Sequence, residues 1–305
     1  MAFPSDYWSV YEEPVHDLTA FLSCVSDLSA TWPDRTFVWR GAADASWALH
    51  SSLYRRASES EGRRIRERAA WAGGLSMRDY ETKIVEEARL WGLQRTALDR
   101  LSALELLAAL QHQGVPTRLL DFTHNAVVAL WFAVDPQLDS RGRALPDTDG
   151  RIFVAQSNGR AIPESWARDL DVPWHVDEPD DWDSDIYVWT PPPLDPRMTR
   201  QQGCFVFAAV PSTQGGWWGP FGAMHADEIR ACVSVPVRMN SPTYVRNTVA
   251  RGRAPGYPLA FTFRIPAASK PNLRRDLARG FGYSHRAMFP DYPGFAAFGS
   301  SIPRR

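Results

Sequence analysis

The sequence predicts an α+β fold, in which short strands alternate irregularly with amphipathic helices. Runs of β-branched and aromatic residues, bounded by glycine, proline or polar residues, recur between segments with helical spacing. They do not follow the regular strand–helix–strand repeat of a parallel sheet. The chain has 305 residues, of which 44% are hydrophobic, so it can bury a large core. We expect a helical N-terminal segment over residues 1–34, packed on one globular unit over residues 35–305.

The first third of the chain predicts two helices, one strand and a short irregular segment. Apolar residues recur with helical spacing over residues 15–32, which predicts a helix. Residues 36–42, Thr-Phe-Val-Trp-Arg-Gly-Ala, are rich in strand formers and predict a strand. Residues 49–56 predict a short irregular segment. Residues 78–93 predict an amphipathic helix with Glu and Arg at its surface positions.

The most informative stretch is residues 101–136. It predicts an apolar helix, a short turn, the strand 117–123 and a second apolar helix over 126–134. The charged residues Arg118 and Asp121 lie inside this apolar passage, and an unpaired buried charge costs on the order of several kcal/mol or more. Strand-to-helix junctions also gather backbone N–H groups that bind anions. The sequence therefore places a candidate site at this junction.

The second half of the chain predicts further strands separated by loops. Residues 160–190 form a predicted insertion, and its acidic, tryptophan-bearing part is interpreted as a lid or a solvated loop. The glycine-tryptophan loop 215–222 is a second candidate lid. The expected strands are 151–156, 185–190, 203–210 and 259–266, and a short helix 270–280 ends at glycine.

Composition argues against several classes of protein. The formal net charge of -1 does not point to a nucleic-acid partner. No run approaches the ~18 apolar residues of a membrane span, so no membrane contact is expected. Cys24, Cys204 and Cys232 form no CxxC pair, which indicates reduced thiols and neither a disulfide framework nor a zinc site. Residues 1–14 lack the features of a signal peptide, so a cytoplasmic location is expected.

Common catalytic signatures are absent from the sequence. It contains no GxSxG elbow, P-loop, GxGxxG or HExxH motif. The 7 histidines show no ligand spacing, so no metal is expected. A hydrolase with two carboxylates stays open, although no pair of carboxylates stands out.

Blocks of residues in a fixed order resemble a known family. They are residues 37–41, 47–49 with 52–55, 111–123 continuing into 129–133, Arg197 with 201–205, and 289–291. In these blocks the chain resembles the FRG-domain family, named for a strand that ends in Phe-Arg-Gly or a close variant. The resemblance runs from about residue 35 to residue 298. Members usually have Gln after Arg-Gly, whereas this chain has Ala42, so any contact made by that side chain is absent.

The layout of these blocks is similar to that of mono-ADP-ribosyltransferases of the arginine–serine–glutamate type. By position, Arg40 fills the slot of the arginine on the first core strand. Thr123, with Asp121 before it, fills the slot where a Ser-Thr-Ser-like strand feeds a helix. Gln201 or Gln202 fills the slot of a glutamate that opens a later strand. The resemblance implies a mixed β core of two packed small sheets with surrounding helices, and NAD as the substrate without a metal.

The resemblance also implies roles for individual residues. The catalytic candidates are Arg40, Asp121, Thr123 and Gln202. The candidates for binding NAD are Arg40, Gly41, Arg118, His112 and Gln201. An arginine can hold a pyrophosphate with two parallel hydrogen bonds, and a glycine lets a ligand approach the backbone. Glutamine supplies no charge for the positive ribose that develops during transfer, so Asp121 or an acidic residue of the loop 177–185 is expected to stand in.

Each of these residues also has a structural interpretation. Arg40 or Arg118 forms an ion pair with Asp121, and such pairs are weak evidence of function. Thr123 caps the following helix. His112 caps a helix end or lies in the core, and residues 289–291 form a packing turn.

Different functions therefore stay open. The first is an NAD-dependent mono-ADP-ribosyltransferase, a bacterial toxin or defence effector that modifies protein or nucleic acid, including DNA, at guanine or another base. An antitoxin or a reversing hydrolase would be its partner. The second is a non-catalytic module that binds NAD, ADP-ribose or nucleic acid and acts through partners. The third is a nucleic-acid effector whose arginines 55, 56, 63, 64, 66 and 68 hold phosphates, with a solvated charged face as the alternative.

Overall fold

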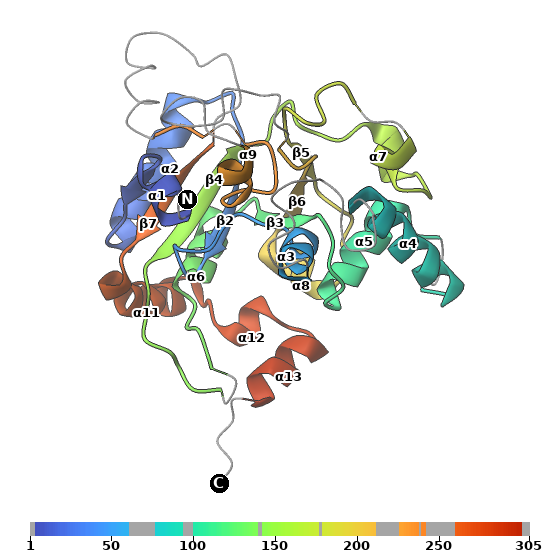
Figure 1. Ribbon diagram of the computed structural model, residues 1–305. Coiled ribbons are helices and arrows are strands. Elements are labelled where there is room, and N and C mark those ends of the chain that lie inside the picture. The colour runs from blue at the N-terminus through green and yellow to red at the C-terminus, as the bar shows by residue number, and fades with distance from the viewer. Residues whose placement is uncertain are drawn as a thin grey trace.

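The computed structural model describes residues 4–60, 77–93, 100–139, 142–176, 179–211, 226–237, 239–241 and 260–300. The candidate lid 215–222 and the arginines 63–68 lie outside the described residues. The described chain contains both helices and a seven-stranded mixed sheet, which confirms the predicted α+β class (Figure 1). No helix in these ranges combines the length and the apolar character needed to cross a bilayer.

The strands form one sheet in the order β1-β7-β4-β2-β3-β6-β5. Their bounds are β1 (Glu12–Pro14), β2 (Phe37–Ala42), β3 (Leu120–Thr123), β4 (Gly150–Gln156), β5 (Tyr187–Trp189), β6 (Gly203–Phe207) and β7 (Ala260–Ile265). The pair β1–β7 is parallel, and the other neighbouring pairs are antiparallel. Because β1 joins the sheet, residues 1–34 contribute a strand as well as helices.

The resemblance implied two packed small sheets, whereas the structure has a single sheet with a weak seam. The seam lies between β2 and β3, where Trp39 and Thr123 form the registered pair. Beyond this pair the Arg40 side chain bridges the strands, because its Nη1 donates to the Asp121 carbonyl oxygen at 2.6 Å. The pair of Trp39 and Thr123 keeps the sheet continuous. Beyond this pair β2 and β3 are not paired, and the sheet opens beside Arg40.

Helices cover both faces of this sheet (Figure 1). In chain order they are α1 (Pro4–Ser9), α2 (Leu18–Thr31), α3 (Ser52–Ser60), α4 (Met77–Leu90), α5 (Ala103–His112), α6 (Ala126–Val134), η2 (Glu164–Ala167), α7 (Pro173–Val176), α8 (Pro196–Gln201), α9 (Ala226–Arg230), η3 (Ala267–Ser269), α11 (Lys270–Phe281), α12 (His285–Met288) and α13 (Tyr292–Ser300). Helices α2, α6 and α11 pack on one face around Trp39 and Ile152, and α1 packs on the other face against Phe153.

Local capping explains the helix starts around the candidate site. Helix α5 begins with a capping box, in which Ser102 and Glu105 each bind the other's backbone N–H. Helix α6 begins at Asn125, whose side chain accepts from the N–H groups of Val127 and Val128. The alternative that Thr123 caps α6 is therefore wrong. Asn125 directly precedes the first helical residue, so its side chain reaches the free N–H groups of the first turn.

Some sequence-predicted elements differ from the structure. Residues 49–56 were expected to be irregular, but α3 begins at Ser52, because the Ser51 hydroxyl accepts from Tyr54 N–H at 3.2 Å in the manner of a cap. The strand expected over 117–123 is shorter, because β3 begins only at Leu120. Before it, the Thr117 hydroxyl accepts from the N–H of Leu119 at 3.2 Å, which makes a local turn in place of strand pairing.

Gly41 lies where β2 contacts the backbone of α6. A Cβ atom at this position would lie 1.9 Å from the Ala129 carbonyl oxygen and 2.6 Å from the Ala133 nitrogen. The missing side chain therefore lets the helix approach the strand. Close approach of a ligand was the reason expected from the sequence, but the structure gives helix packing as the reason for the glycine.

The substitution Gly41→Ala is expected to lower the free energy of unfolding by roughly 3 kcal/mol or more, because strand and helix backbones cannot both relax around the new methyl group. Urea unfolding measures the difference. The matched control is Gly280→Ala in α11, where a Cβ has open space and alanine favours the helix. Equal stabilities of the two variants would contradict this account of Gly41.

Candidate functional site

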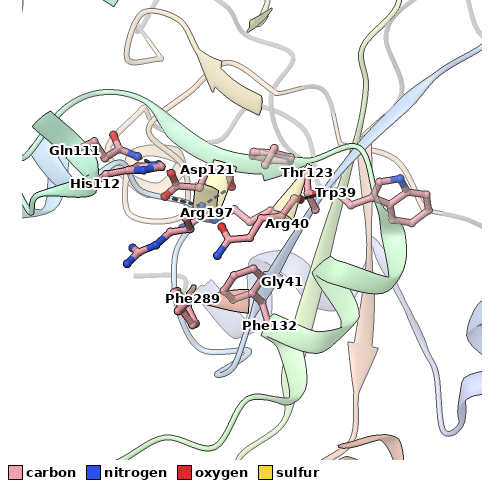
Figure 2. A pocket seen from close by; sticks show the side chains of 12 residues that line it. Trp39, Arg40, Gly41, Gln111, His112, Asp121, Thr123, Phe132, Arg197 and Phe289 are labelled. Atoms are coloured by element: carbon pink, nitrogen blue, oxygen red, sulfur yellow. Dashed lines mark hydrogen bonds and ion pairs between the residues drawn. The ribbon is translucent and has the colours of Figure 1, made fainter. Parts of the chain in front are cut away.

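A cleft of about 270 Å³ opens where β2 and β3 separate (Figure 2). Its walls come from the strands β2 and β3, the end of α5, the helices α6 and α8, and the residues after α12. The lining residues are Trp39, Arg40, Gly41, Gln111, His112, Asp121, Phe122, Thr123, Phe132, Arg197, Gln201 and Phe289. The cleft thus combines cations, a carboxylate, amides and aromatic rings.

A second cavity, here called the side pocket, adjoins the cleft and measures about 200 Å³. Arg40, Gln111 and Asp121 line both cavities, so they stand between them. The other walls of the side pocket are His50, Ser51, Ser52, Arg55, Gly114, Val115, Leu119 and Leu120. The two cavities share a polar partition built around one guanidinium group.

Arg40 and Asp121 form the partition together with Gln111. The Arg40 guanidinium lies 3.7 Å from the Asp121 carboxylate, and the two side chains are 24% and 62% exposed. Gln111 Nε2 donates to Asp121 Oδ1 at 2.7 Å. Burial lowers the pKa of Arg40, and the Asp121 carboxylate opposes that shift. Because an arginine side chain stays charged in proteins, the partition carries a fixed cation beside an accessible carboxylate.

The Arg40 side chain keeps donors for a ligand. Among the described residues, its hydrogen bond goes from Nη1 to the Asp121 carbonyl oxygen. The same guanidinium lies 3.7 Å from the Asp121 carboxylate, and its planar fork has more N–H groups than these two contacts use. A guanidinium with unused donors at a partition between two cavities suits a phosphate or pyrophosphate group.

His112 lines the cleft and has Asp195 as its side-chain partner. The His112 Nδ1 atom is hydrogen-bonded to Asp195 Oδ2. The other oxygen of Asp195 accepts from the N–H of Met198 at 2.9 Å, which caps the start of α8. His112 is the last residue of α5, but its Nδ1 binds Asp195 and the cap of α5 is Gln113, so the alternative that His112 caps the helix is wrong.

Arg197 links α8 to the C-terminal helices. Its Nε and Nη2 atoms donate to the two oxygens of Asp291 at 2.7 and 2.8 Å, and its guanidinium lies 4.9 Å over the Phe289 ring. The hydrogen bonds from Arg197 hold the pKa of Asp291 below its ordinary value. Residues 289–291 do pack as a turn, and this turn also brings Phe289 into the cleft wall.

Thr123 connects β3 to α8. Its hydroxyl donates to the Gln201 carbonyl oxygen at 2.6 Å and accepts from the N–H of Asn125 at 3.0 Å. Thr123 lines the cleft, but its hydroxyl already donates one hydrogen bond and accepts another within the protein. The geometry assigns Thr123 to holding the strand-to-helix junction in place.

Of the two glutamines expected at the start of a later strand, Gln201 lines the cleft. Its Nε2 donates to the Met288 carbonyl oxygen at 2.9 Å, which fixes the carboxamide. Gln202 is exposed, does not line either cavity, and ends α8 in a left-handed conformation with φ 49°. Its carbonyl oxygen accepts from the N–H of His124 at 3.0 Å, which continues the pairing of β3 with β6 by one residue.

The substitution Gln202→Gly is expected to raise the free energy of unfolding by about 1 kcal/mol. A left-handed conformation costs a residue with a side chain roughly 1–2 kcal/mol, and glycine avoids most of this cost. Thermal or urea unfolding measures the gain. Gln113→Gly is the matched control, because Gln113 ends α5 with φ -92° and should gain nothing. A loss of stability in Gln202→Gly would contradict the assigned strain.

Comparison with known proteins identifies part of the chain. Residues 35–142 match the family model of the FRG domain. No curated protein and no solved structure matches the chain. The matched segment 35–142 supplies the β2, α5, β3 and α6 walls of the cleft, and the following chain supplies α8 and Phe289.

Arg118 lies inside the matched segment but outside both cavities. Its guanidinium pairs with Glu81 at 2.6 Å, with the side chains 6% and 0% exposed, and stacks 4.8 Å over the Trp174 ring. Glu81 was expected at the surface of the predicted helix 78–93, but it is buried. The structure therefore pairs Arg118 with Glu81 and not with Asp121, and gives it a packing position outside both cavities.

The insertion predicted over 160–190 packs beside the matched segment. Its tryptophans Trp166, Trp174 and Trp182 are buried in one cluster with residues of α4 and α5. In the described part of this insertion, no residue lines the cleft or the side pocket. The described carboxylates of the loop 177–185, which are Asp180, Asp181, Asp183 and Asp185, therefore do not line the cleft, and Asp121 is the carboxylate on its wall.

The structure brings most of the candidate residues together. Arg40, Gly41, His112, Asp121, Thr123 and Gln201 line the cleft, whereas Arg118 and Gln202 do not. The other six lining residues were not among the site candidates: Trp39, Gln111, Phe122, Phe132, Arg197 and Phe289. All six stand within the FRG-like blocks, so the blocks carried the signal. Over the described residues, no group of three or more potential metal ligands is found.

Proposed function

We propose that the cleft and the side pocket together bind NAD, and that the protein transfers ADP-ribose from NAD to an acceptor. The observation that carries the proposal is the position of Arg40 in the wall shared by the two cavities. A dinucleotide consists of two nucleoside halves joined by a pyrophosphate. A guanidinium between two cavities suits that shape, because it can bind the pyrophosphate while each half occupies one cavity.

The cleft suits the nicotinamide half of the substrate. Phe132 and Phe289 lie with their ring centroids 6.0 Å apart at an interplanar angle of 83°, and they give the cleft an aromatic wall. Such a wall packs well against a flat ring. The exposed carboxylate of Asp121 stands across the cleft as the negative group.

The side pocket suits the other nucleoside half. Ser51, Ser52 and Arg55 give it hydroxyl groups and a second cation beside Arg40. Burial lowers the pKa of His50 to about 4, so its imidazole is neutral at physiological pH and does not add to this charge. The pocket is therefore moderately cationic and polar, as binding of a ribose phosphate requires.

Transfer breaks the bond between nicotinamide and ribose, and positive charge develops on the ribose as nicotinamide leaves without charge. The protein stabilises this change best with a fixed negative group. Gln201 orients by hydrogen bonding but contributes no charge. We assign that role to Asp121, which Gln111 holds in place by the hydrogen bond to Oδ1.

The test is transfer of label from NAD carrying radiolabel in its adenylate phosphate. Protein lysate, single- and double-stranded DNA, and RNA serve as acceptors. We expect label on one acceptor class, and a rate at least about 100-fold lower in Asp121→Asn, with NAD affinity changed only a few-fold. Asp276→Asn, on the exposed side of α11, is the matched control.

A non-catalytic binding module is the second candidate. The observation that favours it is the uncharged, fixed carboxamide of Gln201 in the cleft. Saturable NAD binding with no transfer of label to any acceptor and no release of nicotinamide would favour this module over the transferase. Absence of both NAD binding and transfer would exclude the transferase and a module that binds NAD.

A further inference from the structure

We infer that His112 is the proton acceptor of the transfer reaction, and that Asp195 is its positioning residue. This inference rests on the proposed transferase function and specifies the acceptor. The acceptor group that attacks the ribose must then carry a proton that it loses during the reaction. Such groups are a hydroxyl, an N–H of a base or amide, and water. A nucleophile without such a proton would have no use for the histidine.

The hydrogen-bond geometry fixes the form of the imidazole. A carboxylate only accepts hydrogen bonds, so the contact with Asp195 places the proton of the neutral ring on Nδ1. The Nε2 atom then carries the lone pair. It makes no hydrogen bond with any residue in the described ranges, and His112 lines the cleft. An imidazole with one nitrogen held by a carboxylate and the other unprotonated is the arrangement of a general base.

Asp195 is itself held on both sides. Its Oδ1 accepts from the N–H of Met198 in the first turn of α8, and its Oδ2 binds the histidine. The carboxylate is part of the helix cap, so its position does not depend on a flexible side chain alone. His112 is 13% exposed and packs against Phe205, with ring centroids 6.5 Å apart. The imidazole therefore has one orientation in the cleft wall.

The surrounding charges come from several elements. Asp195 binds the ring from the start of α8, and Arg197 of α8 lines the same cleft. Asp291 interacts with His112 electrostatically from the turn after α12, and Asp121 and Arg40 stand in the partition, which is another wall of this cleft. Arg197 neutralises Asp291 through two hydrogen bonds, and Arg40 lies beside Asp121. Asp195 remains the carboxylate in direct contact with the ring, so it stabilises the imidazolium that forms on proton transfer.

The proposed step is balanced in atoms and electrons. The bond between the ribose carbon and the nicotinamide nitrogen breaks, and its electron pair leaves with nicotinamide, which becomes neutral. The bond between the same carbon and the acceptor atom forms. The acceptor's proton moves to His112 Nε2, and solvent removes it after the product leaves. No oxidant, reductant or metal is needed.

The kinetic test compares NAD turnover, to the acceptor or to water, in the wild type, His112→Gln and Asp195→Asn. Asparagine still caps α8 through its carbonyl oxygen but removes the charge beside the ring. We expect kcat to fall at least about 100-fold in His112→Gln, with a smaller loss in Asp195→Asn and NAD affinity nearly unchanged in both. The fall in wild-type kcat at low pH should disappear in His112→Gln. His175→Gln, an exposed histidine on α7, is the control.

A spectroscopic test does not depend on turnover. Nitrogen-15 NMR of the histidine rings in the full chain should show His112 protonated on Nδ1 and unprotonated on Nε2 at pH 8. In Asp195→Asn this preference should weaken. The opposite tautomer in the wild type would overturn the inference even if the variants of His112 fold poorly.

The outcomes separate this inference from the proposed function. Normal kcat and an unchanged pH profile in His112→Gln, in a wild type that does transfer ADP-ribose, would overturn the role of His112 and leave the transferase in place. A wild type that neither transfers ADP-ribose nor hydrolyses NAD would overturn both. Loss of NAD affinity without loss of kcat would also overturn the inference, because it would make His112 a binding residue.

Discussion

Replacing Arg40 with alanine is expected to lower the affinity of the protein for NAD by on the order of 100-fold. A charge-assisted hydrogen bond contributes roughly 1.5–3 kcal/mol, and a bidentate contact with the pyrophosphate would lose two of them. The guanidinium stands in the wall of both cavities, so its loss removes the contact shared by the two halves of the ligand. Isothermal titration of NAD into the full chain measures the effect.

Two further variants make the Arg40 prediction specific. Arg40→Lys keeps the charge but not the planar pair of donors, so its affinity should fall between those of the wild type and Arg40→Ala. Arg168→Ala removes an exposed arginine that pairs with Glu164 outside the site, and should bind NAD as the wild type does. If Arg40→Ala folds and binds NAD with wild-type affinity, Arg40 is not the anchor of the pyrophosphate.

Replacing Glu81 with alanine is expected to lower the free energy of unfolding by about 3–5 kcal/mol, because it leaves a buried cation without its partner. Glu81 accepts from Arg118 Nε at 2.6 Å and from the indole N–H of Trp174 at 3.0 Å, so the loss also strands a second buried donor. These contacts join α4, the segment before β3 and the insertion. Denaturant unfolding measures the loss.

The control for this prediction is Glu164→Ala, which removes an exposed carboxylate from a surface pair and should change stability by less than about 1 kcal/mol. A double variant, Glu81→Met with Arg118→Leu, should recover much of the stability lost by Glu81→Ala, because a packed apolar pair replaces a stranded charge. A double variant that is less stable than Glu81→Ala would contradict the view that the stranded arginine causes the loss.

Elements with strong local signals could be predicted from the sequence. The helix 126–134 has almost only apolar residues and a preceding asparagine cap, and the structure has the same bounds. The strand containing Arg40 was found from its aromatic and β-branched residues. Helix α8 was not predicted, although Asp195 followed by Pro196 is a common helix start, because six residues carry too little periodicity to recognise.

Pairings between distant residues could not be predicted in the same way. Local sequence suggested that Arg118 pairs with Asp121, three residues away, whereas the partner is Glu81, 37 residues away. Arg197 and Asp291 are 94 residues apart, and only the fold brings them together. The seam between β2 and β3 also depends on how few residues of the two strands pair, which residue types do not reveal. The family resemblance identified these residues as a set but not their contacts.

The most direct measurement of the central claim is equilibrium binding of NAD to the full-length protein, compared with binding of ADP-ribose and of nicotinamide mononucleotide. The account predicts one saturable site that binds NAD more tightly than either fragment, because each fragment fills one cavity or part of both. It also predicts that Arg40→Ala weakens NAD binding most. Absence of saturable NAD binding by the folded protein up to millimolar concentration would contradict the assignment of these cavities to NAD.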